Sequence, residues 1–452
     1  MQVKQLLDNG RLNWDLISNT FSLVGTTVLT SGLGFIYWWV AARQFSPEAV
    51  GLASAAISTM SLLGTFSMVG LGTVLIGELP RQPGKQIAFV ITALLVAGST
   101  GLIMGLIFAF AGSGLAASLQ PLFGNLGSSL IFALGVSITA LTLVLDQALI
   151  GLLRGDVQLW RNGLFAVVKL VALLIVSYWF SEKLGLTIYT TWLVGNLLSL
   201  LFLFGFAAYK GINFRSYRPQ WGLLRGLGRT ALSHHALNLA LLTPNLVLPV
   251  LVTIMLSTTV NAYFYVANMV ATVVFMGPAA LTTVLFAVGA ADVGGLSQKI
   301  RFTIKIAVLI GLVANVLLIF SADPVLGLFG PGYAQGAEWT LRILGLGIFP
   351  VIIKDHFVAI HRIQGRTNQA ILPVTAGSLT ELIGAILGGL MGGLTGLSLG
   401  FVIAMCLEAA LMGPLVYRAV RPSKQQAKEK LLVNGELELA AQAEIRLNFP
   451  QN

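Results

Sequence analysis

The sequence predicts an all-α polytopic membrane protein of about twelve transmembrane helices in two six-helix lobes. Three observations predict it: the composition, a series of long apolar stretches, and the placement of Lys and Arg. Hydrophobic residues make up 56% of the 452 positions and charged residues 10%, and the mean hydropathy is +0.86. A soluble domain carries roughly 25% charged residues. This chain therefore has too few charges to cover a surface that faces water.

The apolar stretches are long enough to cross a bilayer. A spanning helix needs about 20 mostly apolar residues. Helices are the expected form because lipid offers no partner to an open backbone donor or acceptor. The stretches are 17–42, 48–77, 87–112, 127–153, 162–181, 186–208, 230–256, 260–288, 302–321, 338–361, 369–391 and 395–418.

Lys and Arg gather at both ends and at every second connection. Of the 27 Lys and Arg residues, 22 lie there, and the other connections hold only Arg43 and Lys183. Cytoplasmic loops carry such an excess. We therefore expect a multi-pass membrane protein with both termini in the cytoplasm. The same pattern accounts for the net charge of +10 without a nucleic-acid partner.

The spans and charges divide the chain into five parts. They are a cytoplasmic segment (1–16), an N-lobe (17–208), a basic inter-lobe connection (209–229), a C-lobe (230–418) and a cytoplasmic tail (419–452). The N-terminus shows no cleavable signal peptide. The single cysteine, Cys406, allows no disulfide framework or Cys-based metal site.

The two halves resemble each other at an offset of 210 residues. Residues 49–75 align without gaps onto 259–285, and Gly155 meets Gly365 after the fourth and tenth spans. Each half holds six spans, so both enter the membrane in the same orientation. This predicts parallel repeats about a pseudo-two-fold axis along the membrane normal. Transporters of this build bind substrate between the halves and rock one half against the other.

The first eighty residues carry a family resemblance. Arg43, the turn Ser46-Pro47-Glu48 and Gly51 open a Gly-rich second span that ends before a Pro. This resembles the Wzx-type polysaccharide biosynthesis flippases of the multidrug/oligosaccharidyl-lipid/polysaccharide (MOP) exporter superfamily. The turns at 152–155 and 362–366 are also similar to that family.

The resemblance implies a non-enzymatic transporter whose lobes form a V around a central cavity. The implied cargo is a polyprenyl-pyrophosphate-linked oligosaccharide, an O-antigen or exopolysaccharide repeat unit, moved from the cytoplasmic to the outer leaflet. The implied location is a bacterial-type cytoplasmic (inner) membrane. Implied partners are the membrane lipid and the polysaccharide polymerase and glycosyltransferase machinery. No cofactor is implied beyond coupling to H⁺ or Na⁺.

Polar residues in the apolar spans are candidate cavity residues, because ionisable groups at membrane depth are costly. In the seventh span, His234, Asn238 and Asn245 share one helical face, next to His235. They either line the cavity or tie helices together. Arg43 either binds substrate at the exit or extends to the headgroups.

The remaining intramembrane charges are candidates for pairing or for ion coupling. Depth alone suggests Asp146 with Lys169 in one lobe and Lys354 with Glu381 in the other, since buried charges are normally paired. The alternatives are that Lys354 or Lys169 meets the pyrophosphate, or that an acid carries the coupling ion. The acids of the C-lobe that belong to this set are Asp355, Glu381 and Glu408.

Two other functions compete with a flippase. One is a cation-coupled multidrug or small-molecule extruder of the same superfamily, although the first span has no acidic residue at 21–42. The other is a polytopic glycosyltransferase or ligase. Such enzymes need catalytic acids on sizeable external loops, and the external connections here are short. No catalytic constellation or metal-ligand spacing is found in the sequence.

Overall fold

The computed structural model describes residues 22, 25–115, 117–179, 185–213, 217–226, 228–291 and 295–420. The cytoplasmic segment predicted at 1–16 lies outside these residues, as does all of the predicted tail after residue 420. What is described is helical almost throughout.

The N-terminal half begins with helical residues 25–44. It continues with α2 (Pro47–Ser67), α3 (Leu71–Glu78), α4 (Gln86–Leu115), the short η1 (Ala117–Leu119) and α5 (Gln120–Phe123), then α6 (Leu126–Gly151), α7 (Gly155–Trp179) and α8 (Gly185–Tyr209). In the C-terminal half follow η3 (Trp221–Gly226), α9 (Arg229–Met255), α10 (Thr258–Ala291), α11 (Leu296–Gly327), α12 (Pro331–Leu346), α13 (Ile348–Ile363) and α14 (Thr367–Val420).

The polytopic all-α prediction is confirmed. Within the described chain, nine helices are long and apolar enough to cross a membrane, and α12 and α13 together make a tenth span with a 40° bend. The 54-residue α14 is two helices joined at Gly392-Gly393, where the backbone leaves helical geometry. With the helix at 25–44, these elements account for each predicted apolar stretch.

Two details of the predicted spans are wrong. The external connection expected at 322–337 is only three residues long, because α11 runs to Gly327 and α12 starts at Pro331. The second span is not one helix: it breaks between α2 and α3, where Val69 and Gly70 have φ of 48° and 79°. Positive φ is accessible to glycine but costly for a β-branched residue.

The internal repeat is visible in the local structure, with a corrected register. Ser46 and Ser257 cap the starts of α2 and α10. The side-chain oxygen of each accepts a hydrogen bond from the backbone N–H three residues further along the chain. The capped starts of α2 and α10 are therefore related by an offset of 211 residues. The turns after α6 and α13 have the same backbone hydrogen bonds, with Leu153 and Gly365 in the positive-φ position, an offset of 212. The predicted equivalence of Gly155 with Gly365 is therefore wrong by two residues.

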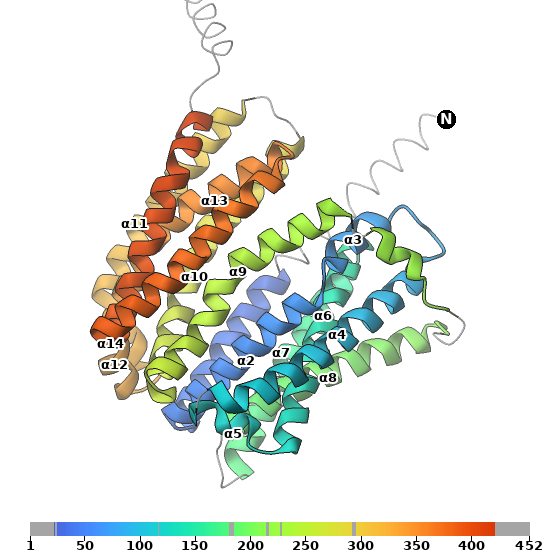
Figure 1. Cartoon of the computed structure of the whole chain (residues 1–452), viewed down its shortest axis with the longest axis horizontal. Helices are drawn as coiled ribbons and strands as arrows, with labels where there is room; N and C mark the ends of the chain where they lie inside the picture. The colour runs from blue at the N-terminus through green and yellow to red at the C-terminus, as the bar shows by residue number, and fades with distance from the viewer. Residues whose placement is uncertain are drawn as a thin grey trace, which may run out of the picture.

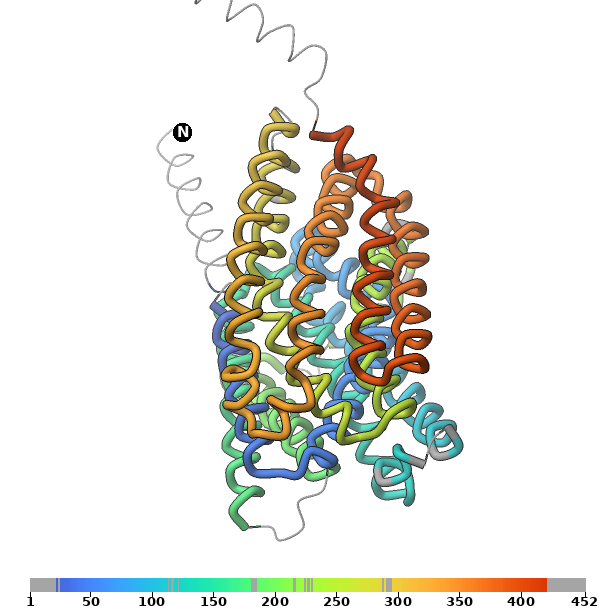
Figure 2. The backbone as a smooth tube through the Cα atoms, turned by 90° about the vertical axis from the view of Figure 1, so that its left-hand side faces the viewer, coloured from blue at the N-terminus to red at the C-terminus, as the bar shows by residue number. Residues whose placement is uncertain are grey.

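Two groups of helices lie side by side, with α2 and α9 between them (Figure 1). α4 packs on α6 and α7 on α8 in one group, whereas α13 packs on α14 and α11 on α12 in the other. α2 contacts both α9 and α10 across the boundary. A side view shows the two halves of α14 running antiparallel (Figure 2). The two halves of α14 approach so closely that a Cβ at Gly388 would overlap the carbonyl oxygen of Gly396.

The charge distribution predicts which end of the bundle faces outward. We call external the end that holds Arg43, the start of α2 and Phe329, and internal the opposite end, which holds Arg154 and Arg366.

Candidate transport cavity and the contacts that close it

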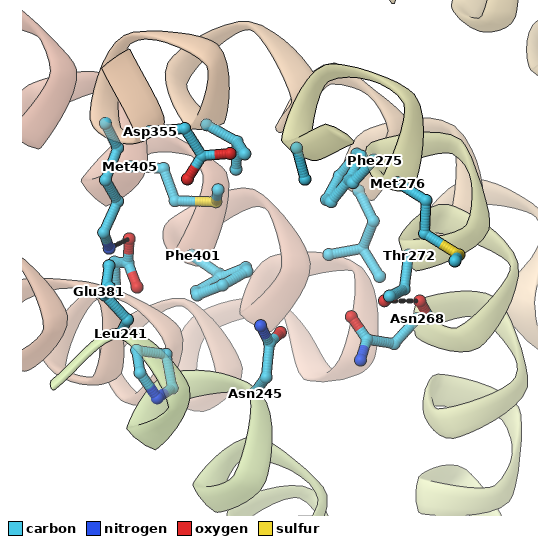
Figure 3. Close-up of a pocket in the computed structure, with 15 residues that line it drawn as sticks. Leu241, Asn245, Asn268, Thr272, Phe275, Met276, Asp355, Glu381, Phe401 and Met405 are labelled. Carbon is cyan, nitrogen blue, oxygen red and sulfur yellow. Dashed lines mark hydrogen bonds and ion pairs between the residues drawn. The ribbon is translucent and has the colours of Figure 1, made fainter. Parts of the chain in front are cut away.

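A cavity of about 280 Å³ lies inside the C-terminal half. Its lining comes from α9, α10, α12, α13 and both halves of α14. Figure 3 shows Asn245, Asn268, Asp355 and Glu381 reaching into it from different helices. Apart from these four residues, Thr272 and Lys354, the wall is apolar and aromatic, which is typical of a small-molecule site whose few polar groups orient the ligand.

Lys354 lies at the wall of this cavity between two carboxylates. Its Nζ donates to Glu381 Oε1 at 3.0 Å and to Glu408 Oε2 at 2.9 Å. The predicted contact of Lys354 with Glu381 is thus present, and the structure adds Glu408. All three side chains are at most 10% exposed. Since two acids share one ammonium, the cluster carries a net negative charge unless it binds a proton or another cation.

Glu408 separates the cavity from a second hollow. It lines a groove of about 420 Å³ together with Leu411 and Leu415 of α14 and His361 of α13. Leu411 is 84% exposed, so this groove opens on the side of the helices that would face lipid. Glu408 fits here because position 377 is glycine: a Cβ there would overlap its carboxyl group.

A further cleft of about 290 Å³ lies between the N-terminal and C-terminal halves. Its N-terminal wall includes Ser31, Trp38 and Ser58, and its C-terminal wall includes Asn245, Tyr265, Asn268 and Thr272. Since Asn245, Asn268 and Thr272 also line the first cavity, the two spaces adjoin. The combined lining offers amide and hydroxyl groups and the rings of Trp38 and Tyr265, which lie 4.6 Å apart.

Towards the external end the halves are in direct contact. Asn261 Nδ2 of α10 donates to Gly51 O at 2.8 Å and contacts Ser54 Oγ at 3.0 Å. A Cβ at Gly51 would overlap the carbonyl oxygen of Thr258, so only glycine allows this approach. Gly51 and Ala262 are equivalent at the offset of 211, and a Cβ at Gly51 would lie 3.0 Å from Ala262 N. The crossing therefore lies close to the pseudo-two-fold axis.

Arg43 closes the same end rather than lining the cavity. Its Nε donates to Leu328 O at 2.7 Å and its Nη2 to Gly327 O at 3.3 Å. Trp39 Nε1 donates to the same Leu328 carbonyl at 2.9 Å. The last carbonyls of a helix have no partner within the helix, and its C-terminus attracts cations. Arg43 thus caps α11 from the other half of the molecule.

The polar face predicted on α9 extends from the cavity to the internal end. Asn245 lines both cavities, and Asn238 Oδ1 accepts from Arg362 Nη2 at 2.8 Å. His234 interacts electrostatically with Arg362, whereas His235 interacts with the backbone of Phe66. Arg362 keeps its buried Nε without a hydrogen-bond partner.

The predicted pairing of Asp146 with Lys169 is wrong. Asp146 instead binds Arg161 Nη2 at 2.9 Å and Asn162 Nδ2 at 3.2 Å. α7 begins at Gly155, seven residues earlier than expected, so Arg161 is level with Asp146 in the antiparallel pair. Lys169 lies about 12 Å further along α7, since a helix rises about 1.5 Å per residue.

Lys169 is surrounded by aromatic rings. Its Nζ lies 3.6 Å from the ring centre of Trp192, 4.6 Å from that of Phe165 and 5.0 Å from that of Tyr37. Only 3% of Lys169 is exposed. No hydrogen bond or ion pair of its ammonium is found in the described part of the chain. Cation–π attraction is therefore its main compensation for the loss of water.

Several residues of the cavities and of the contacts around them were not identified from the sequence. Asn261 and Asn268 are seven residues apart on α10, which places them on the same face. This spacing was a usable signal. Trp38 and Tyr265 had none, because aromatic residues in apolar spans are common. Arg362 belongs to the excess of Lys and Arg that predicts the orientation, and this excess does not indicate what its side chain contacts. Among the described residues no cluster of His, Cys, Asp and Glu could hold a metal ion.

Solved structures share this fold, whereas two comparisons of the sequence found no match. No family model matches the chain, and no curated protein sequence is similar to it. One similar solved structure is the inward-facing conformation of a multidrug resistance MATE family transporter of the MOP superfamily. Its TM-score is 0.71 at 18% identity, over 86% of this chain and 94% of that one. The outward-facing conformation of a MATE family transporter gives a TM-score of 0.60 at 16% identity, over 89% and 96%.

A second kind of transporter is similar to the same degree. The lipid II flippase MurJ, in an inward closed conformation, gives a TM-score of 0.67 at 15% identity, over 87% of both chains. At these identities the likeness concerns the fold and not the cargo. The chain therefore has the fold of the transporters of the MOP superfamily.

Proposed function

We propose that this protein flips a polyprenyl-pyrophosphate-linked oligosaccharide from the cytoplasmic to the outer leaflet by alternating access. The observation that carries the proposal is the cleft between the halves. It combines neutral amide and hydroxyl groups with two aromatic rings, and it lies beneath a closed external contact. Neutral hydrogen-bonding groups and ring faces suit a sugar, which presents hydroxyls and C–H faces.

The closed external end supports alternating access. Asn261 at Gly51 and Arg43 at Leu328 join the halves there, while the cavities lie on the internal side of these contacts. A rocking motion would break these few contacts and open the cleft to the outside. The fold neighbours include both an inward-facing and an outward-facing transporter.

Arg362 is the group that we expect to meet the pyrophosphate. Lys354, a candidate for that role, has both carboxylate neighbours within 3.0 Å and is not free to bind an anion. Arg362 lies near the internal end, where its Nε has no hydrogen-bond partner and Asn238 fixes one edge of the guanidinium. Guanidinium groups suit phosphate because they present several donors in one plane.

The location and partners follow from the same proposal. The protein would reside in a bacterial-type inner membrane, take its cargo from the glycosyltransferases that build it, and deliver it to a polysaccharide polymerase. The similarity in fold to a lipid II flippase is compatible with a lipid-linked cargo.

One observation favours a second function, a cation-coupled small-molecule extruder. Among the described residues, the C-lobe cavity and its wall hold three acids, Asp355, Glu381 and Glu408, against two cations, Lys354 and the nearby Arg362. This excess of negative charge would attract a cationic cargo or a coupling cation.

The test compares the two functions in the same host. Deletion of the gene should abolish surface polysaccharide and accumulate the lipid-linked precursor in the inner leaflet, and the wild-type gene should restore both. Asn245→Ala and Asn268→Ala should each reduce restoration. Asn213→Ala, at the internal end of the N-terminal half, is the matched control and should restore fully. Normal polysaccharide in the deletion strain together with raised drug sensitivity would establish the extruder instead.

A further inference from the structure

Lys169 has an environment that fits an exchangeable proton better than a fixed charge. Its ammonium faces the rings of Tyr37, Phe165 and Trp192, and only 3% of the residue is exposed. Burial disfavours the charged form of a lysine, and the ring faces return part of the lost hydration. A change in the hydration around such a lysine would therefore shift the balance between its charged and neutral forms.

The groups that face Lys169 do not supply a compensating charge. The helix at 25–44 contributes the phenol of Tyr37, which hydrogen-bonds Ile188 O at 3.0 Å and Thr191 Oγ1 at 2.8 Å. α8 contributes Trp192 and the small Gly195, against which the lysine stem packs. α6 contributes Asp146, which is already bound to Arg161 and lies nearer the internal end.

The position that Lys169 occupies in the repeat is charged in both halves of the chain, but with opposite sign. At the offset of 212 set by the turns, Lys169 is equivalent to Glu381. In the C-terminal half the acid has Lys354 as its partner. The position in the N-terminal half that corresponds to Lys354 is Thr142, whose hydroxyl donates to Thr139 O. The N-terminal half therefore has a charged residue, Lys169, at the position of Glu381, but the neutral Thr142 at the position of Lys354.

The helix at 25–44 connects this lysine to the external contact. Tyr37 touches the ammonium, Trp38 packs on Tyr265 of α10, and Trp39 donates to Leu328 O. Three consecutive residues therefore contact the N-terminal half, α10 and the end of α11. A movement of this helix on opening of the external end would therefore disturb the aromatic surroundings of Lys169.

We propose that Lys169 is the site that takes up the coupling proton, from the external side. The closed, dry arrangement described here binds the proton weakly, and the externally open state, in which water reaches Lys169, binds it tightly. By linkage, low pH favours the open state and high pH the closed one. The inference rests on the proposed alternating access, and it names the coupling ion as H⁺ and its carrier as a base in the N-terminal half.

The experiment measures opening rather than transport. Ser58 lines the cleft beneath the external contact, so Ser58→Cys in a Cys406→Ser background reports whether the cleft is open. Right-side-out vesicles are treated with a membrane-impermeant maleimide while an ionophore sets the pH equal on both sides. The wild-type lysine should give labelling that slows several-fold as the pH rises.

Two variants fix the charge state. Lys169→Met is permanently neutral and should give slow labelling at every pH, whereas Lys169→Arg is permanently charged and should give fast labelling at every pH. Lys210→Met is the matched control, because Lys210 also lies over an aromatic ring, at 5.6 Å from Phe206, but on the exposed end of α8. It should keep the wild-type response. Size-exclusion chromatography shows which variants are folded.

The proposal is overturned if a folded Lys169→Met or Lys169→Arg protein keeps the wild-type pH response, or if the control loses it as well. The result is independent of the cargo, since no saccharide is present. A lost pH response in the Lys169 variants alone would therefore stand even if reconstituted protein failed to flip a lipid-linked saccharide.

Discussion

Removal of the Arg43 side chain should favour the externally open state. The guanidinium donates to the carbonyls of Leu328 and Gly327, which end α11 in the other half of the molecule. Hydrogen bonds to a charged group contribute about 1.5–3 kcal/mol when buried, but Arg43 is exposed and water competes for both partners. We therefore assign about 1 kcal/mol to this contact, which corresponds to about a fivefold change in the ratio of open to closed protein.

The assay uses the same Ser58→Cys reporter in right-side-out vesicles. Arg43→Gln should raise the labelling rate from the outside by about fivefold, since about 1.4 kcal/mol is a factor of ten. Arg342→Gln is the control, because it also removes an arginine whose side chain is only partly exposed. Its partner, Glu338 at 2.6 Å, lies on the same helix, so no contact between the halves is lost. An unchanged rate in Arg43→Gln, or an equal rise in the control, would refute the closing role of Arg43.

Three further predictions test the interior. Lys354→Glu should abolish transport, and the double exchange with Glu381→Lys should restore a large part of it, as measured by surface polysaccharide in the host; failure to rescue would mean that Lys354 acts on the cargo. Asp146→Asn should lower the stability by about 3 kcal/mol, seen as a lower Tm of the purified protein, because Arg161 is left buried without its acid. Gly388→Ala should cost about 2 kcal/mol by the same measurement, because the new Cβ forces the halves of α14 apart, whereas Gly413→Ala, with open space around it, should leave Tm unchanged.

The sequence alone predicted the membrane class, the number of spans and the approximate repeat. These follow from local quantities. Each apolar stretch must form a helix because lipid satisfies no backbone group, and its length is set by the bilayer. The contact of Lys354 with Glu381 could also be predicted, because two opposite charges at similar depth in one lobe have few other partners. Asn245 followed from helical spacing with His234 and Asn238.

Register and partner choice needed the tertiary structure. The error at Asp146 arose because the start of α7 decides which cation is level with the acid, and apolar content does not fix helix ends. Glu408 could not be assigned, since its approach to Lys354 depends on the fold of α14 at Gly392-Gly393 and on the absence of a side chain at Gly377.

Arg43 shows the same division most clearly. Its sequence position placed it at the external end of the first span, as an exception to the charge rule. Its partners are carbonyl groups about 285 residues away, which every residue type possesses, so no sequence pattern could reveal them. The sequence determined which segments enter the membrane, because that depends on each segment's own hydrophobicity. The tertiary structure decided which faces meet, because contacts between the halves depend on how the helices cross.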